Sequence, residues 1–337
     1  MDRSCPPFYF PTNVVLLDDD TNFLRHFSLL LDPQLPCRPF SSATAALEQM
    51  NTQASLLHSF TELANITMSD DAEDHTYLDL NKVHQLIYQP ERFSQITVAI
   101  IDYDMPEMNG IEVCEKINHP EIKKILLTGK ADEKLAVEAF NSGLIHQFIQ
   151  KSNDNVDNHV NRAVEKLQLE YFLEVASSVP ITLTNGTASF LADREFNRNV
   201  RKSIGDNKIV EFYICENPRG LLMLDSAGNA NFMFAISEDV LNTHYDMALA
   251  SQAPEELLKL LKDKSYIPWF PPDGFYSGDS QPDWQNHLYK VDFSCGNNEQ
   301  NFYSLATSVP LEMIDVSRIV PFETYLKTFD EKYSQLP

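Results

Sequence analysis

The chain has 337 residues, of which 43% are hydrophobic, and its formal net charge is −23. This length and this apolar content are sufficient for two domains with cores of their own. An acidic surface repels phosphate backbones and anionic lipids, so nucleic acid is unlikely to be a partner and no membrane association is expected. No stretch reaches the roughly 18 uninterrupted apolar residues that cross a bilayer, and we expect a cytoplasmic protein.

The five cysteines are scattered, without a CxxC pair or a zinc-finger spacing, which favours reduced thiols. The N-terminus lacks the charged-then-apolar pattern of a signal peptide.

The first half of the chain alternates short apolar segments with helical patterns. The predicted strands are 14–17, 37–40, 96–101, 124–127 and 145–149. The predicted helices follow the first strand, start after the possible cap Ser41-Ser42, and span about 132–141 and 156–176. Continuous apolar strands alternating with helices imply a parallel sheet covered on both faces.

Additional residues separate the second and third predicted strands. Two apolar-periodic pieces, at 56–63 and 80–87, flank the acidic stretch Ser69–Asp74. We predict an insertion at about 51–95 that forms one or two helices around an exposed acidic loop.

After about Pro180 the pattern changes to short apolar segments separated by turn signals. Residues 210–215 read as a strand, and 221–224 and 231–236 read as a hairpin around Ser226–Asn229. Helices are expected to open at Ser237 and at Pro254, and a later hairpin is expected within 287–309. The second half is therefore predicted to be a mainly antiparallel α+β domain.

Polar groups collect at the carboxyl ends of the predicted parallel strands, where such sheets place functional groups. Asp18 and Asp19 follow the first strand, Asp102 the third, Thr128 the fourth and Lys151 the fifth. Clustered carboxylates repel one another unless a cation neutralises them, and oxygen ligands suit Mg²⁺. A carboxylate nucleophile, a divalent cation, a hydroxyl and an amine suit the transfer of a phosphoryl group onto Asp102.

These segments, VVLLDDD, IIDYDMPEMNG, ILLTGKAD and the lysine after the last strand, resemble the receiver domain of two-component response regulators. The resemblance implies a flavodoxin-like (βα)5 receiver at 12–155 with Asp102 as the phosphoacceptor. It also implies Mg²⁺ ligands from Asp18, Asp19, Asp102 and the Asp104 backbone carbonyl. Thr128 and Lys151 then contact the phosphoryl group, and Phe148 is the aromatic residue that changes rotamer on activation. Partners are a sensor histidine kinase or a phosphotransfer protein.

The sequence departs from this family in three places. Ser152 stands where proline usually follows the lysine, Thr128 follows Asp102 by only 26 residues, and the insertion is atypical. Asp104 and Lys130 stand two positions after the phosphoacceptor and the switch hydroxyl. A pair between them would hinder attack by water and prolong the phosphorylated state, whereas two exposed charges are the alternative. Asp20 is expected to be exposed rather than a metal ligand.

The segment 156–179 is longer than the last helix of a receiver requires. Its apolar stripe through Val160, Val164, Leu167, Phe172 and Val175 is compatible with a connector packed on the second domain or with a dimerisation helix. Dimerisation is favoured, because phosphorylation commonly acts through it in this family.

Three alternative functions are considered for residues 180–337. Residues 171–337 carry 13 Lys and Arg against 23 Asp and Glu, a net charge of −10, which disfavours DNA binding. The local basic run Arg194–Lys208 is either a docking face or a solvated helix face. No catalytic triad, phosphate loop or metal motif supports an enzyme, although His244, His287, Asp225 and Ser237 carry reactive groups. Binding of a downstream protein or small ligand is expected first, an atypical DNA-binding domain second and an enzymatic domain third.

The whole chain, including PPFYFPTNVVLLDDD, is similar to response regulators of Legionella quorum-sensing systems, and this similarity extends into the second half. It implies control by kinases that detect an α-hydroxyketone signal, a phosphorylation-linked homodimer, and an output without an established DNA-binding motif.

Overall fold

The computed structural model describes residues 5–54, 64–67, 75–78, 80–129, 133–177, 182–183, 186–187, 189–270, 284–296, 300–307 and 315–333. The acidic stretch Ser69–Asp74, the predicted helical piece at 56–63 and Lys130 lie outside these ranges. The chain divides into two compact units. The receiver unit consists of Tyr9–Asp79, Gln85–Pro180 and Val320–Pro337, and the second unit consists of Met1–Phe8, Leu80–His84 and Ile181–Ile319.

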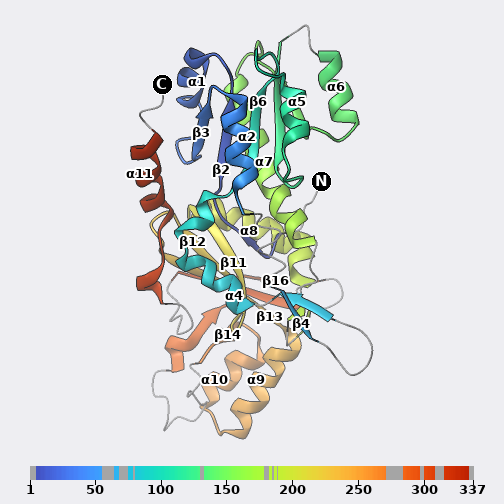
Figure 1. Cartoon of the computed structure of the whole chain (residues 1–337). Coiled ribbons are helices and arrows are strands. Elements are labelled where there is room, and N and C mark those ends of the chain that lie inside the picture. Colours follow the sequence, from blue (N-terminus) through green and yellow to red (C-terminus); the bar gives the residue numbers. More distant parts are fainter. Residues whose placement is uncertain are drawn as a thin grey trace. The chain divides into compact units, whose positions relative to one another are not determined.

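A five-stranded parallel sheet forms the centre of the receiver unit, as the sequence predicted (Figure 1). Its order is β3 (Cys37–Phe40), β2 (Asn13–Leu17), β6 (Ile96–Asp102), β7 (Lys123–Thr128) and β8 (Gln147–Gln150). The residues of β2, β6 and β7 are all buried, which explains their unbroken apolar character.

Side chains alternate between the two faces of this sheet and build two cores. Val14 and Leu16 face one core with α1 (Thr21–Ser28) and α7 (Val156–Ser177). Val15 and Leu17 face the other core with α2 (Ala43–Thr52), α5 (Gly110–Lys116) and α6 (Glu133–Asn141). Helices therefore cover both faces, and only the strand ends remain for chemistry.

The long helix α7 is present, but its apolar stripe is not exposed. Val160, Val164 and Leu167 belong to the receiver core. Phe172 is fully buried, with its ring 4.9 Å from that of Phe10 and 5.1 Å from that of Tyr9. This stripe stabilises the chain's own fold, so a dimer would have to use another surface.

The insertion differs from the all-helical prediction. Strands β4 (Ala64–Thr67) and β5 (His75–Leu78) pair as an antiparallel hairpin. Helix α4 (Leu80–Gln85) and the 3-10 turns η1 (Leu86–Tyr88) and η2 (Pro90–Ser94) follow, and these agree with the helical pattern expected there. A hairpin needs pairing between segments separated in the chain, which helical periodicity alone does not report.

The C-terminal helix α11 (Phe322–Tyr333) is part of the receiver unit, whereas the sequence placed it with the second domain. Its Phe322 and Tyr325 rings lie 5.1 Å and 5.3 Å from the ring of Phe93. The Tyr325 hydroxyl accepts a hydrogen bond from Asn13 Nδ2 at 2.9 Å. The predicted boundary near residue 180 is therefore not the last point at which the chain changes unit, because it returns to the receiver unit at Val320.

The second unit is built on a six-stranded sheet with the order β1, β11, β12, β13, β17, β16. Its strands are β1 (Phe8–Tyr9), β11 (Ile209–Glu216), β12 (Arg219–Asp225), β13 (Ala230–Ser237), β16 (Phe293–Cys295) and β17 (Asn301–Ala306). The recorded pairings from β11 through β13 and β17 to β16 are antiparallel. The predicted strand at 210–215 and the hairpin at 221–236 are confirmed.

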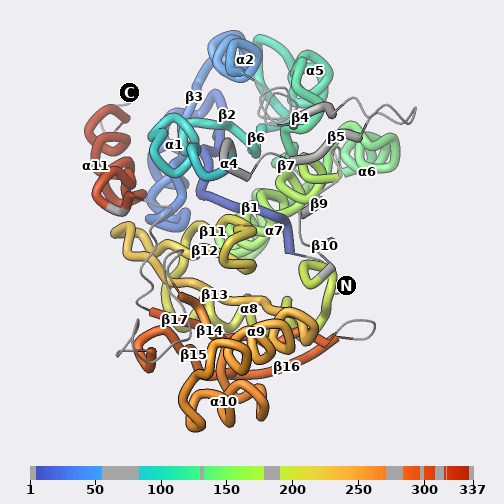
Figure 2. The backbone as a smooth tube through the Cα atoms, turned by 90° about the horizontal axis from the view of Figure 1, so that it is seen from below, coloured from blue at the N-terminus to red at the C-terminus, as the bar shows by residue number. Residues whose placement is uncertain are grey.

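Helices and short sheets complete this unit: η4 (Ser189–Ala192), α8 (Arg194–Asp206), α9 (Glu238–Ala250), α10 (Glu255–Lys262) and η5 (Trp284–His287), with η6 (Val316–Arg318) near its end. Helices α9 and α10 lie side by side (Figure 2). The hairpin expected within 287–309 is confirmed only for β16 and β17, because β15 (Leu288–Lys290) pairs with β14 (Tyr266–Pro268). A further small pair joins β9 (Thr182–Leu183) and β10 (Gly186–Thr187).

Candidate phosphoacceptor site

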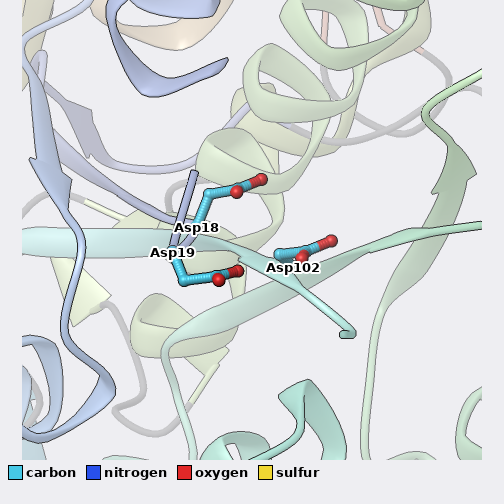
Figure 3. A group of neighbouring side chains, drawn as sticks. All are labelled: Asp18, Asp19 and Asp102. Carbon is cyan, nitrogen blue, oxygen red and sulfur yellow. The ribbon is translucent and has the colours of Figure 1, made fainter. Parts of the chain in front are cut away.

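Three carboxylates lie together at the carboxyl ends of two neighbouring strands. Asp18 and Asp19 directly follow β2, and Asp102 is the last residue of β6. Because β2 and β6 run parallel and in register from Val14 to Leu17, their ends meet at one edge. One oxygen from each of the three carboxylates lies within 4.8 Å of the others (Figure 3).

Lys151 connects two of these acids. Its Nζ lies 2.5 Å from Asp18 Oδ2 and 2.8 Å from Asp102 Oδ1. The ammonium also lies 4.5 Å from the centroid of the Phe23 ring on α1. The backbone N–H of Lys151 donates to the Thr128 carbonyl at 3.0 Å, so the end of β7 sets the position of the lysine.

Burial and pairing act in opposite directions on the charges of this site. Burial raises the pKa of Asp102, and the hydrogen bond and charge of Lys151 offset this only in part. Burial lowers the pKa of Lys151, but its bonds to Asp102 and Asp18 outweigh that effect and leave the pKa above its usual value. Lys151 therefore remains an ammonium ion that holds two acids together.

Thr128 ends β7 and is completely buried. Within the part of the chain that the structure describes, its hydroxyl oxygen has no hydrogen-bond partner. A buried hydroxyl without a partner costs free energy, so this group suits an added ligand atom. Phe148, on β8, is half-buried, and its ring lies edge-on to Phe140 at 6.2 Å.

The loop after Asp102 is held at a fixed distance from the sheet. Tyr103 N–H donates to the Leu127 carbonyl at 2.9 Å, and Gly110 N–H donates to the Tyr103 carbonyl at 2.9 Å. A Cβ atom on Gly110 would lie 2.4 Å from the Asp102 carbonyl oxygen. The close approach of residue 110 to the Asp102 carbonyl therefore requires glycine, which explains the glycine at the end of the IIDYDMPEMNG motif.

Other candidates have local structural roles or are exposed. Asp20 caps α1 by accepting from Asn22 N–H at 2.9 Å, which accounts for it without a metal. The Asp104 side chain is exposed, and its predicted partner Lys130 lies outside the described residues. His146 Nδ1 accepts from Lys124 N–H at 3.1 Å, a structural role, and His159 is exposed.

The acidic group fits a small divalent cation. Its donors are carboxylate oxygens, which Mg²⁺ prefers. Asp18 is buried and Asp19 is exposed, so the group faces solvent on one side and leaves room for the water ligands that Mg²⁺ retains.

In the second unit, the reactive groups noted in the sequence are used mainly for turns and caps. Asp225 accepts from Ala227 N–H and Asn229 N–H, both at 2.9 Å, and Ser237 caps α9. Burial lowers the pKa of His244. The basic run falls on α8, where Arg198 and Lys202 are exposed and Arg198 pairs with Glu195 at 3.1 Å.

The sequence did not indicate that Lys151 would bond Asp18 as well as Asp102. The register of β2, β6, β7 and β8 sets this geometry, and it can be inferred only once the strand order is known. No helix among the described residues is long and apolar enough to cross a membrane.

Comparison with known proteins gives one match within the receiver unit and one match over nearly the whole chain. The family model for the response regulator receiver domain matches residues 62–161, which include Asp102, Thr128 and Lys151 but begin after Asp18 and Asp19. The solved structure of the Legionella pneumophila response regulator LqsR is 32% identical, with a TM-score of 0.78, and the match covers 98% of each chain.

Two further structures match about half of this chain. An adenylate cyclase from Rhodopirellula baltica is 19% identical with a TM-score of 0.35, over 50% of this chain and 94% of its own. A CheY-like receiver domain protein from Methanospirillum hungatei is 18% identical with a TM-score of 0.33, over 49% of this chain and 98% of its own. No curated protein sequence matches significantly.

Proposed function

Because the chain belongs to the response regulator family and is related to LqsR over nearly its whole length, we propose that it accepts a phosphoryl group on Asp102 from a sensor histidine kinase or a phosphotransfer protein. One observation carries this proposal. Lys151 bonds Asp102 and Asp18 at one edge of the sheet, where the buried Thr128 hydroxyl has no hydrogen-bond partner in the described part of the chain.

The chemistry follows from these groups. An Asp102 carboxylate oxygen attacks phosphorus, the O–P bond forms, and the P–N bond to the donor histidine breaks. The imidazole leaves with the electron pair and takes up a proton. Lys151 offsets the charge of the transferred group, and the Thr128 hydroxyl donates a hydrogen bond to one of its oxygens. Mg²⁺, held by Asp18, Asp19, Asp102 and the Asp104 carbonyl, supplies further positive charge when bound.

Intact-mass measurement after treatment with acetyl phosphate and magnesium tests the proposal. Wild-type protein gains one phosphate and Asp102→Asn gains none, whereas Asp104→Asn, which changes an exposed acid on the same loop and keeps its backbone carbonyl, still gains one phosphate. A wild-type protein without the adduct, or an adduct that persists in Asp102→Asn, overturns the assignment.

For the second unit we propose non-catalytic output, in which the phosphorylated state promotes a homodimer and the binding of a downstream protein or small ligand. The acidic balance of residues 171–337 supports this choice over DNA binding. Sedimentation with and without acetyl phosphate measures the dimer. Specific DNA binding at physiological salt would replace this proposal with a phosphorylation-controlled transcription factor.

A further inference from the structure

The chain passes from the second unit into the receiver unit at two points, and each point is followed by a strand that carries part of the acidic site. Met1–Phe8 belong to the second unit, and β2 begins at Asn13, only five residues after Phe8. Leu80–His84 also belong to the second unit, and β6 begins at Ile96. Each acid-bearing strand is therefore preceded by a segment that folds with the second unit.

Both segments attach to the same residue of that unit. Ile214 N–H donates to the Pro7 carbonyl at 2.7 Å. The Ile214 carbonyl accepts from His84 Nε2 at 2.9 Å. The N–H and C=O of one strand residue point to the same side of the strand, so Pro7 and His84 share the β1 side of β11.

The histidine contact is buried and specific. His84 is 7% exposed, and its Nε2 also lies 3.2 Å from Cys215 Sγ. Since a carbonyl oxygen can only accept, Nε2 carries the proton. Burial lowers the pKa of His84, although the bond to Ile214 opposes this, so the ring is a neutral donor. Loss of the ring would leave the Ile214 carbonyl without this partner.

The path from His84 to β6 is compact and held by buried contacts. Ile87 and Phe93 are fully buried. Arg92 is 3% exposed and donates to the Gln89 carbonyl and to the Val320 carbonyl, both at 2.9 Å. Such a segment transmits a displacement better than a flexible linker does, because its backbone has few alternative conformations.

Hydrogen bonds also join the first residue of β2 to the residues just before β6. Asn13 N–H donates to the Gln95 carbonyl at 2.8 Å, and Asn13 Nδ2 donates to the Ser94 carbonyl at 3.1 Å. The Gln53 side chain bonds both the N–H and the carbonyl of Ile96, at 2.8 Å and 3.0 Å. A change in how β2 and β6 lie against each other therefore reaches both segments that bond Ile214.

We propose that the edge of β11 at Ile214 and Cys215 is where the second unit senses the state of the acidic site, with His84 as the positioning residue. The inference rests on the proposed function, since phosphate added at Asp102 is the change to be sensed. It assigns the insertion a role: the part from Leu80 to Ser94 connects Ile214 to the strand that ends in Asp102.

Hydrogen exchange of peptides from β11, measured on the full chain with and without acetyl phosphate and magnesium, tests this coupling. Phosphorylation changes β11 exchange in wild type, and His84→Ala reduces that response by about 2- to 30-fold, the range typical of coupling residues. His84→Gln, which keeps an N–H donor, restores part of it. Ser237→Ala, which removes the cap of α9 in the same unit, serves as the control and keeps the full response.

Intact mass measured on the same samples separates the two proposals. If wild type and His84→Ala carry the same amount of phosphate and show the same change in β11 hydrogen exchange, the coupling is overturned. Absence of phosphate on wild type overturns the proposed function, and Asp18→Asn then provides the perturbation, since it removes one ion pair of Lys151. In that case the coupling requires Asp18→Asn to change β11 exchange more when His84 is present than in His84→Ala. An equal change in both backgrounds, or no change in either, refutes it. If His84→Ala does not fold, His84→Gln and Cys215→Ala are compared in its place.

Discussion

Replacing Gly110 with alanine tests how closely the phosphoacceptor loop must approach α5. The new Cβ would lie 2.4 Å from the Asp102 carbonyl oxygen, 2.7 Å from Leu126 Cδ1 and 3.0 Å from Tyr103 Cα. Ordinary contacts begin near 3.4 Å, so the backbone must open by roughly 1 Å. Overpacking of this kind typically costs about 1–3 kcal/mol. The helix propensity of alanine returns less than about 1 kcal/mol, so the net effect is destabilising.

Urea unfolding and phosphate uptake measure the two consequences. We expect Gly110→Ala to lower the unfolding free energy and to slow phosphorylation, because the carbonyl that must move belongs to the phosphoacceptor itself. Gly205→Ala is the matched control: its Cβ meets nothing within 4 Å on the exposed side of α8, and it should stabilise by about 0.5–1 kcal/mol. Unchanged stability and an unchanged phosphorylation rate in Gly110→Ala would refute the close-approach argument.

Three further expectations concern polar side chains of the receiver unit. Thr128→Val replaces a hydroxyl that has no hydrogen-bond partner among the described residues by an apolar group of the same shape, so stability should stay equal or rise by up to about 1 kcal/mol, while the response to phosphate is weakened; a clear loss of stability in urea would contradict this. Lys151→Ala leaves Asp18 and Asp102 facing each other, so unfolding should become easier by about 1–3 kcal/mol, and equal urea midpoints would show that the pairs contribute nothing. Burial and the neighbouring lysines lower the pKa of His146 to about 4 from 6.5. The unfolded chain therefore binds the proton first, and stability is lost as the pH falls from about 6.5 toward 4. His146→Gln should weaken that pH dependence, and identical pH profiles of the unfolding free energy would contradict it.

The receiver fold could be predicted because its three central strands, β2, β6 and β7, are short and fully buried. Runs such as 96–101 have no polar face, and this pattern with intervening helices leaves few arrangements other than a parallel sheet. Once the sheet is assumed, Asp18, Asp102 and Thr128 must meet at one edge. Most of the site therefore follows from local sequence and one topological rule.

The remaining features depend on contacts between distant segments. Helix α11 belongs to the receiver unit because Tyr325 bonds Asn13, 312 residues away, and no periodicity within α11 names that partner. For the same reason, the pairing of β15 with β14 rather than with its neighbour β16 could not be anticipated. The insertion looked helical because strand pairing between β4 and β5 leaves no 3.6-residue signal.

The balance of charge explains why the site needs a hydroxyl as well as cations. Among the described residues, the carboxylates of Asp18, Asp19 and Asp102 face one ammonium group, that of Lys151, so two negative charges are left for a divalent ion to offset. A phosphoryl group on Asp102 would replace one negative charge with about two, so one negative charge would then exceed the combined positive charge of Lys151 and the divalent ion. Neutral donors must then share it, and Thr128 offers a buried hydroxyl with no other use in the described structure. The buried Thr128 hydroxyl, which has no partner among the described residues, therefore complements the excess charge of the phosphorylated state, and for this reason Thr128→Val should weaken the response without weakening the fold.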